Sequence, residues 1–239
     1  MAFDLPREVI LPIDRVDVRL ASSPHPFERE HSDRIDENWR REQAANPALY
    51  DGQMVLLSSL SLDGTRLEGM SHAIRYATFL YWRRHRSYSS AEHVYAHAAL
   101  VTADNALMTI RMGSHTTSAG QVYFAAGSFE PSDFRDGFVD LHFNMAREVQ
   151  EETGLNINDL PRDGRYHALS EQRGTVIFRR YYLNEDADTV ASAIRRFVAN
   201  DPNPEIEGPV IIRHAADLPD GLAPHMAPIV AWHFANPLL

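Results

Sequence analysis

Residues 147–155 read REVQEETGL, and this is the most informative stretch of the chain. Glu148, Glu151 and Glu152 are spaced i, i+3 and i+4, which puts them within about one 100° arc of a helix. Gly154 follows at the position where helices commonly end. Carboxylates at such spacings repel one another by roughly 0.3 kcal/mol per pair. A Mg²⁺ ion would reverse that repulsion, because it binds through a few carboxylates, waters and substrate phosphates.

The residues upstream predict the clearest amphipathic helix of the chain, over residues 138–153. Its apolar stripe lies beside the arc of the glutamates rather than opposite it, and consists of Phe138, Leu141, Met145 and Val149. The carboxylates are therefore expected to border buried surface and to point into a crevice. The alternative is that the glutamates form an ordinary solvated face, which is the commoner role of a Glu-rich turn.

The nine-residue string resembles the second half of the Nudix box, G-x5-E-x7-R-E-U-x-E-E-x-G-U, where U is apolar, and it matches at every defined position. Gly127 resembles the glycine that opens the box, and Asp133 stands where the family has its next glutamate. Nineteen residues, 128–146, separate Gly127 from Arg147, where the pattern has thirteen. Six extra residues therefore lie between Asp133 and Arg147. In the family, this glutamate supports the geometry of the arginine and the catalytic carboxylates. The candidates for that role here are Asp133, Asp136 and Asp140.

The resemblance covers residues 90–235 and implies an α/β fold, a Nudix-type α/β/α sandwich with a mixed sheet. It implies hydrolysis of a nucleoside diphosphate linked to another group, in which Mg²⁺, or alternatively Mn²⁺, neutralises charge on the phosphate oxygens. By resemblance, Glu148 and Glu152 bind the metal and polarise the attacking water, and Glu151 completes the metal site. Arg147 is expected to orient a glutamate rather than touch substrate. Which glutamate acts as the general base stays open.

The layout, a long N-terminal segment before a lengthened box, most resembles the UDP-sugar diphosphatases, which release UMP and a sugar 1-phosphate. Pyrophosphatases of ADP-ribose, coenzyme A or dinucleotides are the alternative enzyme class. A further alternative is a ligand sensor that keeps the Nudix fold without catalysis. Such a sensor usually lacks box carboxylates and carries a basic DNA-binding module, whereas here all three glutamates are present and the chain is acidic.

Three residues outside the helix are candidates for contacts with the substrate. Arg111, near the end of a predicted strand, is expected to clamp the pyrophosphate through its fork of donors, with a surface ion pair as the alternative. Glu130 follows the glycine that opens the box. It is a candidate for an additional ligand of the metal or a water, with a simple turn carboxylate as the alternative. Glu205, with Glu207 as the alternative, precedes a late strand where family members place a further acidic ligand.

Elsewhere the pattern predicts strands interspersed with helices. Alternating or continuous apolar runs predict strands at residues 8–20, 55–61, 66–71, 94–102, 106–112, 121–126, 175–183 and 210–213. Helical patterns occupy residues 34–45, 76–83, 188–199 and 221–234. Strands flanked by helices are typical of a layered α/β domain.

Two parts of the chain are expected. Residues 1–88 form a small α+β extension that completes the substrate pocket, mediates dimerisation or does both, and residues 89–239 form a Nudix hydrolase domain. The expected boundary is the basic and polar run at residues 83–90, RRHRSYSS. We expect a homodimer, since oligomers of this kind are common.

Composition excludes several classes of function. The chain has 239 residues, no cysteine and a net charge of -10. It therefore has no disulfides and no thiolate sites, and it lacks the basic footprint that nucleic-acid binding needs. No apolar run approaches the roughly 18 residues of a membrane span, and residues 1–10 do not resemble a signal peptide. We expect a cytoplasmic protein with a small-molecule substrate, and neither nucleic acid nor a membrane as partner.

Overall fold

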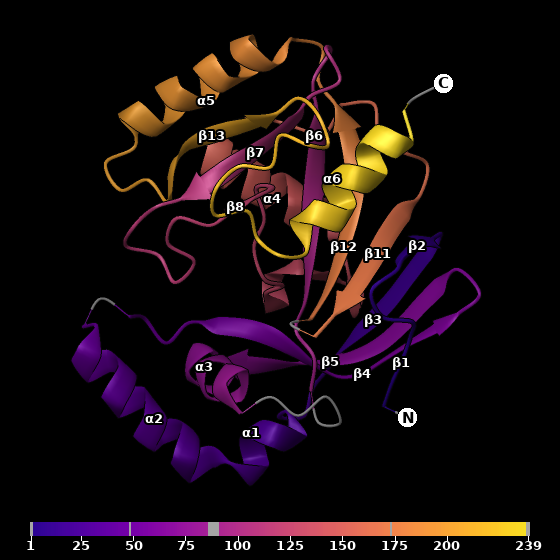
Figure 1. Ribbon diagram of the computed structural model, residues 1–239. Coiled ribbons are helices and arrows are strands. Elements are labelled where there is room, and N and C mark those ends of the chain that lie inside the picture. Colours follow the sequence, from indigo (N-terminus) through magenta and orange to yellow (C-terminus); the bar gives the residue numbers. More distant parts are fainter. Residues whose placement is uncertain (1, 48, 86–90, 173, 238–239) are drawn as a thin grey trace. The chain divides into compact units, whose positions relative to one another are not determined.

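The computed structural model of the protein describes residues 2–47, 49–85, 91–172 and 174–237. The fold is mixed α/β, and its contacts divide the chain into two compact units (Figure 1). Unit 1 comprises residues 1–95, 128–141 and 170–175, and unit 2 comprises residues 96–127, 142–169 and 176–239. The expected boundary between residues 88 and 89 falls outside the described residues.

Unit 1 is built on a mixed sheet of the order β1-β4-β5-β3-β10-β9. The antiparallel hairpin of β4 (Gln53–Asp63) and β5 (Arg66–Arg75) lies at its centre, around the turn that the Asp63-Gly64 pair predicts. β3 (Arg15–Ala21) is parallel to β5, and β1 (Phe3–Asp4) is parallel to β4. The strand pattern predicted at residues 8–20 corresponds to two strands, β2 (Ile10–Ile13) and β3.

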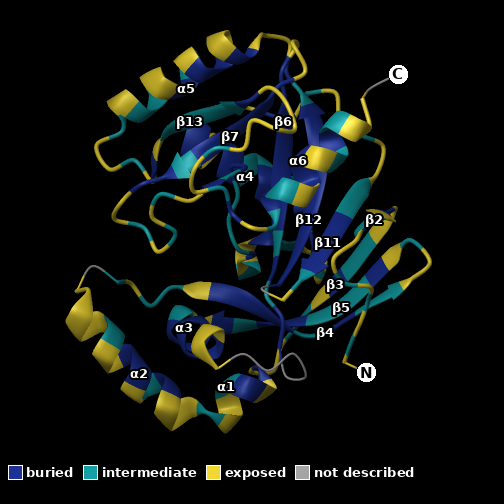
Figure 2. Ribbon diagram, viewed as in Figure 1, coloured by how far each residue is buried: buried dark blue, intermediate teal, exposed yellow. Residues whose placement is uncertain are grey.

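Three helices accompany this sheet, namely α1 (Pro26–Glu30), α2 (Ser32–Ala45) and α3 (Tyr76–Arg84). Their inward faces are apolar and share one core with the strands, which includes Phe27, Ile35, Trp39, Leu56, Ile74 and Leu80. The opposite face of α2 carries charged residues and is exposed (Figure 2). The predictions of helices at 34–45 and 76–83 are confirmed, with small differences at the ends.

The sheet of unit 2 runs in the order β13-β7-β6-β12-β11, with β8 (Val122–Tyr123) paired to β7. β7 (Leu107–Met112) is antiparallel to both β6 (Val94–Val101) and β13 (Ile206–Ile212). β12 (Gly174–Tyr182) is the next strand after β6, and backbone hydrogen bonds from Thr175 to His93 and from Leu183 to Val101 show that these two are parallel. β11 (Tyr166–Glu171) follows β12 in the order. The sheet is mixed, because it combines the parallel pair β6 and β12 with the antiparallel pairs of β7.

The helices of unit 2 are α4 (Leu141–Thr153), α5 (Ala187–Asn200) and α6 (Met226–Ala235). Alternate side chains of β12 contact different helices: Tyr181 reaches Met145 of α4, whereas Phe178 packs edge-on against Trp232 of α6. Because successive side chains of a strand point to opposite faces, α4 and α6 lie on opposite faces of β12. Unit 2 is therefore a layered α/β/α arrangement, and no helix in the described part of the chain is long and apolar enough to span a bilayer.

Several predicted boundaries are wrong for local reasons. The helix predicted from residue 138 begins at Leu141, because Phe138–Val139 is strand β10, paired with β3 and with β9 (Phe134–Arg135). The helix predicted from residue 221 begins at Met226, after a turn at Gly221 with φ +81°. The strand predicted at 121–126 is only the two residues of β8. The sequence patterns did not predict α1 or β11.

The hairpin of β9 and β10 accounts for the length of the box. Residues 134–139 are the two short strands and the turn between them, and they number six, as many as the extra residues between Asp133 and Arg147. Asp136 and Gly137 both have positive φ, +51° and +82°, as a two-residue hairpin turn requires. An Asp-Gly pair between two phenylalanines was a local signal that could have predicted it.

Candidate active site

Helix α4 carries the glutamates of the 147–155 string. Leu141, Met145 and Val149 are buried along one side of it, and Glu148 and Glu152 are buried beside them, with 9% and 5% of their surfaces exposed. The helix ends at Gly154, which has a φ of +72° and donates its N–H to the carbonyl of Gln150. The helical spacing predicted that all three carboxylates border buried surface. This is confirmed for Glu148 and Glu152, whereas the side chain of Glu151 is exposed.

Glu152 is the most deeply enclosed of these carboxylates. Its Oε2 accepts a hydrogen bond from the backbone N–H of Ala126 at 2.8 Å. Burial, and next the charge of Glu148, raise the pKa of Glu152 well above its ordinary value, and Glu205 and Glu151 add to this effect against the Ala126 hydrogen bond. Four carboxylates of unit 2 therefore share one electrostatic neighbourhood.

Arg147 joins two of the glutamates. Its guanidinium lies 2.7 Å from Glu148 Oε1 and 3.1 Å from Glu151 Oε2, and its own side chain is largely buried. Glu151 has the most exposed side chain of the three glutamates, at 58%. Arg147 therefore bridges two carboxylates and holds them relative to each other.

Gly127 lies directly against Glu148. A Cβ atom at this position would overlap the Glu148 carboxylate, far inside van der Waals distance. The absence of a side chain, rather than an unusual backbone conformation, is what Gly127 provides here. Residues 126 and 127 therefore form a backbone cradle in which Ala126 contacts Glu152 and Gly127 contacts Glu148.

Glu205 lies just before β13, and its backbone carbonyl accepts a hydrogen bond from Gly113 at 2.8 Å. Its charge raises the pKa values of both Glu152 and Tyr123. The structure thus brings Glu205 into the neighbourhood of the α4 glutamates, although the two are more than fifty residues apart in sequence. The alternative candidate, Glu207, lies within β13.

Arg111 lies in β7 and connects two loops. Its Nη1 donates to the backbone carbonyls of Gly120 and Asp220, each at 3.0 Å. This part of the guanidinium is therefore engaged by the protein itself. Glu130 belongs to unit 1, where it is exposed and precedes the 3₁₀ turn Pro131–Asp133, whose Asp133 accepts a hydrogen bond from the Glu130 N–H at 2.8 Å.

Tyr123 is a residue of this neighbourhood that the sequence patterns did not indicate. It ends β8, and burial together with the charges of Glu152, Glu205 and Glu148 raises the pKa of its hydroxyl. The nearby Ser118 side chain acts in the opposite direction and lowers this pKa. Its place four residues before Gly127 gave no chemical signal, since one tyrosine in a short strand is usually part of the core.

These residues fit a hard divalent cation in charge and chemistry. Glu148 and Glu152 are oxygen donors of like charge, both buried, and the cradle at Gly127 leaves the Glu148 carboxylate free of side-chain bulk. Within the described residues, no three His, Asp or Glu side chains are arranged as a complete metal site. The protein would thus supply two buried carboxylates, with the remaining ligands from water and substrate.

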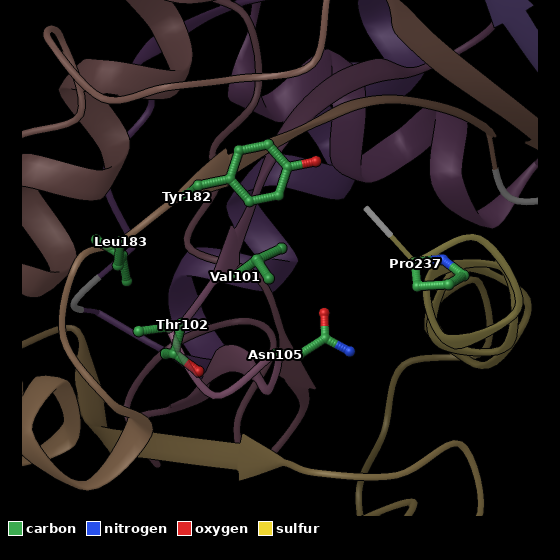
Figure 3. Close-up of a pocket in the computed structure, with 7 residues that line it drawn as sticks. Val101, Thr102, Asn105, Tyr182, Leu183 and Pro237 are labelled. Carbon is green, nitrogen blue, oxygen red and sulfur yellow. The ribbon is translucent and has the colours of Figure 1, made fainter. Parts of the chain in front are cut away.

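Unit 2 also contains a cavity of about 340 Å³ at the ends of β6 and β12 (Figure 3). It is lined by Val101, Thr102, Ala103, Asn105, Tyr182, Leu183 and Pro237. The Tyr182 hydroxyl donates to Asp163, and burial raises its pKa. None of the predicted site residues lines this cavity, and its walls carry no carboxylate.

No protein-family model matches the sequence, and no curated protein matches it significantly. Among solved structures, it is similar to the MutT protein from Methanosarcina mazei Go1, at 14% identity and a TM-score of 0.40 over 60% of this chain and 93% of that one. It is also similar to a protein from Deinococcus radiodurans, at 15% identity and a TM-score of 0.40 over 59% of this chain and 83% of that one. A mutT/nudix family protein from Listeria innocua has 16% identity and a TM-score of 0.41 over 60% of this chain and 92% of its own.

Proposed function

We propose that the protein is a divalent-metal-dependent hydrolase of the Nudix type, which cleaves a phosphoric anhydride in a nucleoside diphosphate linked to another group. The observation that carries the proposal is the pair Glu148 and Glu152, buried one helical turn apart in a string that matches the second half of the Nudix box. Solvated surface glutamates would be exposed, and these two are not. Arg147 pairs with Glu148, but among the described residues no cationic side chain pairs with Glu152, so the two carboxylates together call for a further cation.

The chain's own residues would arrange this chemistry. Glu148 and Glu152 would hold Mg²⁺, or Mn²⁺, which supplies charge neutralisation on the phosphate oxygens and lowers the pKa of water. Arg147 fixes Glu148 and Glu151 through its two ion pairs, and the Ala126 N–H fixes Glu152. Glu205 adds a fourth carboxylate to the same neighbourhood. Catalysis of this kind depends mainly on positioning and electrostatic stabilisation.

Within this class we propose a UDP-sugar as the substrate, with UMP and a sugar 1-phosphate as products. Support comes from the layout, a lengthened box behind a long N-terminal segment. Glu130 and Glu205 are proposed as further contacts to the substrate or its metal. For Arg111 we propose a contact through the nitrogens other than Nη1, which already donates to two loop carbonyls. Residues 1–88 are proposed to contribute substrate or dimer contacts.

A panel of anhydrides tests the proposal. UDP-glucose, ADP-ribose, NADH and coenzyme A would each be incubated with the protein and Mg²⁺, with EDTA in parallel, and the products separated by chromatography. We expect Mg²⁺-dependent cleavage, with UDP-glucose the best substrate. Preference for an adenine compound would replace the UDP-sugar assignment and keep the reaction class. Tight binding of these compounds without turnover would contradict the hydrolase and favour a ligand sensor.

A further inference from the structure

Arg179 of β12 is a buried arginine whose guanidinium pairs with no carboxylate of the described residues. Its side chain keeps 9% exposure, and its Nη2 donates to the Tyr181 hydroxyl at 3.1 Å. Its Nε is buried and has no acceptor. In the part of the chain that the structure describes, no Asp or Glu forms an ion pair with this guanidinium, whereas eight other arginines each have one: Arg7, Arg15, Arg66, Arg75, Arg84, Arg147, Arg180 and Arg213.

The next residue of the strand provides a direct comparison. Arg180 is equally buried, at 8% exposure, but its guanidinium lies 2.8 Å from Asp163 and donates to the carbonyl of Asn236 at 2.6 Å. Arg180 is thus compensated in the way that buried charges usually are. Arg179 has two aromatic rings in place of a carboxylate, with its Cζ 4.1 Å from the ring centre of Tyr166 and 5.4 Å from that of Tyr181. Ring faces attract a cation, but they leave the Nε–H without an acceptor.

A second arginine extends the same group of donors. The Tyr181 hydroxyl lies 2.8 Å from Nδ1 of His142, and Nε2 of His142 lies 3.5 Å from Nη1 of Arg162. Arg162 is exposed and otherwise donates to the carbonyl of Asn158 at 3.1 Å. No described carboxylate pairs with Arg162 either. Two guanidinium groups are therefore connected through a His–Tyr pair.

We propose that Arg179, with Tyr166, Tyr181, His142 and Arg162, forms a binding site for a phosphoryl group. Two uncompensated guanidinium groups suit a doubly charged oxyanion, and a guanidinium with a free Nε–H matches phosphate geometry. This site is separate from the catalytic glutamates, because His142 precedes Glu148, the nearest of them, by six residues on α4, about 9 Å along a helix, and Glu152 by ten residues, about 15 Å. Its ligand is a phosphate monoester of a small molecule or free phosphate, and the site does not depend on the proposed hydrolase activity.

Binding of inorganic phosphate without metal tests the site directly. EDTA removes divalent cations, so phosphate cannot bind through a metal at the α4 glutamates. Melting curves would be recorded in phosphate and in chloride at equal ionic strength, and phosphate affinity measured by calorimetry. For the wild type we expect saturable binding and a melting temperature several degrees higher in phosphate. Arg179→Met should abolish both effects, whereas Arg195→Met, which removes an exposed arginine of α5, should preserve them.

Two milder variants keep the test decisive if Arg179→Met does not fold. Arg179→Lys keeps the charge but loses the fork, and Tyr181→Phe removes the hydroxyl that holds Nη2; each should weaken phosphate binding at least about tenfold. UMP, which carries a phosphate monoester, is the second probe. Tighter binding of UMP than of phosphate, lost in Arg179→Lys, would identify a nucleotide as the ligand, and equal binding would identify the free ion. Absence of binding to the wild type, or equal affinity in wild type and Arg179→Lys, would overturn the proposal.

Discussion

Glu152 combines two features that rarely occur together without a ligand. It is almost fully buried, and its nearest charged groups, including Glu148 and Glu205, have the same sign. The Ala126 N–H is the hydrogen-bond donor that compensates it within the protein. A structural glutamate in this position would gain from a cationic partner, but the neighbouring Arg147 pairs with Glu148 and Glu151 instead.

Glu152→Gln should therefore remove activity and spare the fold. The amide keeps the shape and still accepts the Ala126 hydrogen bond, but it lacks the charge that a hard cation needs. By analogy with the loss of one oxyanion donor, turnover on the best substrate with saturating Mg²⁺ should fall about 10²- to 10³-fold. The melting temperature without metal should stay the same or rise, since a repelling charge has gone. Turnover close to that of the wild type would remove Glu152 from the site.

Gly127 leads to a separate prediction about Glu148. In Gly127→Ala the new Cβ would overlap the Glu148 carboxylate and displace it. The displaced atoms are the end of a flexible side chain, so the melting temperature should change little. Turnover should fall about 10²-fold, because displacements of about 1 Å at a reacting centre have effects of this size. Full activity in this variant would show that the position of Glu148 is not critical.

At the scale of elements, the features predicted correctly from the sequence are those that local periodicity determines. The core of α4, its end at Gly154 and the burial of Glu148 and Glu152 follow from helical spacing alone. Tyr123 and the neighbourhood of Glu205 depend on which strands pair, and pairing across such sequence distances leaves no local pattern. The start of α4 was misplaced because Phe138 continues the apolar stripe of the helix although it belongs to β10.

The end of α4 is a position where only glycine fits. Gly154 has a φ of +72°, and a Cβ there would overlap the ring of Phe197 in α5. Gly154→Ala should therefore destabilise the protein by about 1–3 kcal/mol, measured by urea denaturation. Gly164→Ala is the control, since a Cβ at that position meets no atom. Equal midpoints for the two variants would contradict the account of this helix end.

The start of α1 predicts a dependence of stability on pH. His25 is buried, its Nδ1 accepts the Phe27 N–H at 3.0 Å, and its ring meets His72 edge-on at 5.0 Å. Burial, and then the charge of His72, lower the pKa of His25 from 6.5 to about 4. Because the pKa of His25 is lower in the folded protein, the unfolded chain binds a proton at this histidine at a higher pH than the folded protein does. The stability that this group contributes is thus complete above pH 6.5 and is lost as the pH falls towards 4.

His25→Asn isolates that contribution. Asparagine can also accept the Phe27 N–H at the start of the helix, and it does not titrate. Between pH 6.5 and 4 the wild type should lose up to about 3 kcal/mol more stability than the variant, measured by denaturant unfolding at a series of pH values. Parallel curves for the two proteins would show that protonation of His25 is not linked to folding.

At the scale of the whole molecule, the chain crosses between its units several times. Segments 128–141 and 170–175 belong to unit 1 although they lie between segments of unit 2. Local composition reflects only residues that are close in sequence. It therefore cannot predict that a later segment of the chain packs into an earlier unit. The division into residues 1–88 and 89–239 stays a prediction about function.

The net negative charge of the chain bears directly on the claim that Glu148 and Glu152 bind a metal ion. A chain with a net charge of -10 repels an anionic substrate, and the α4 glutamates add to that repulsion. A cation bound at Glu148 and Glu152 would reverse the sign of the field where the phosphates must lie. The account therefore depends on whether this pair binds a divalent cation at all.

Titration of Mn²⁺, followed by electron paramagnetic resonance, measures this directly. The wild type should bind at least one Mn²⁺ that Mg²⁺ displaces. Glu152→Gln should bind it at least about tenfold more weakly. Glu185→Gln, which removes an exposed carboxylate of unit 2, should bind Mn²⁺ as the wild type does. Equal Mn²⁺ affinity in all three proteins would contradict the assignment of a metal to the α4 glutamates.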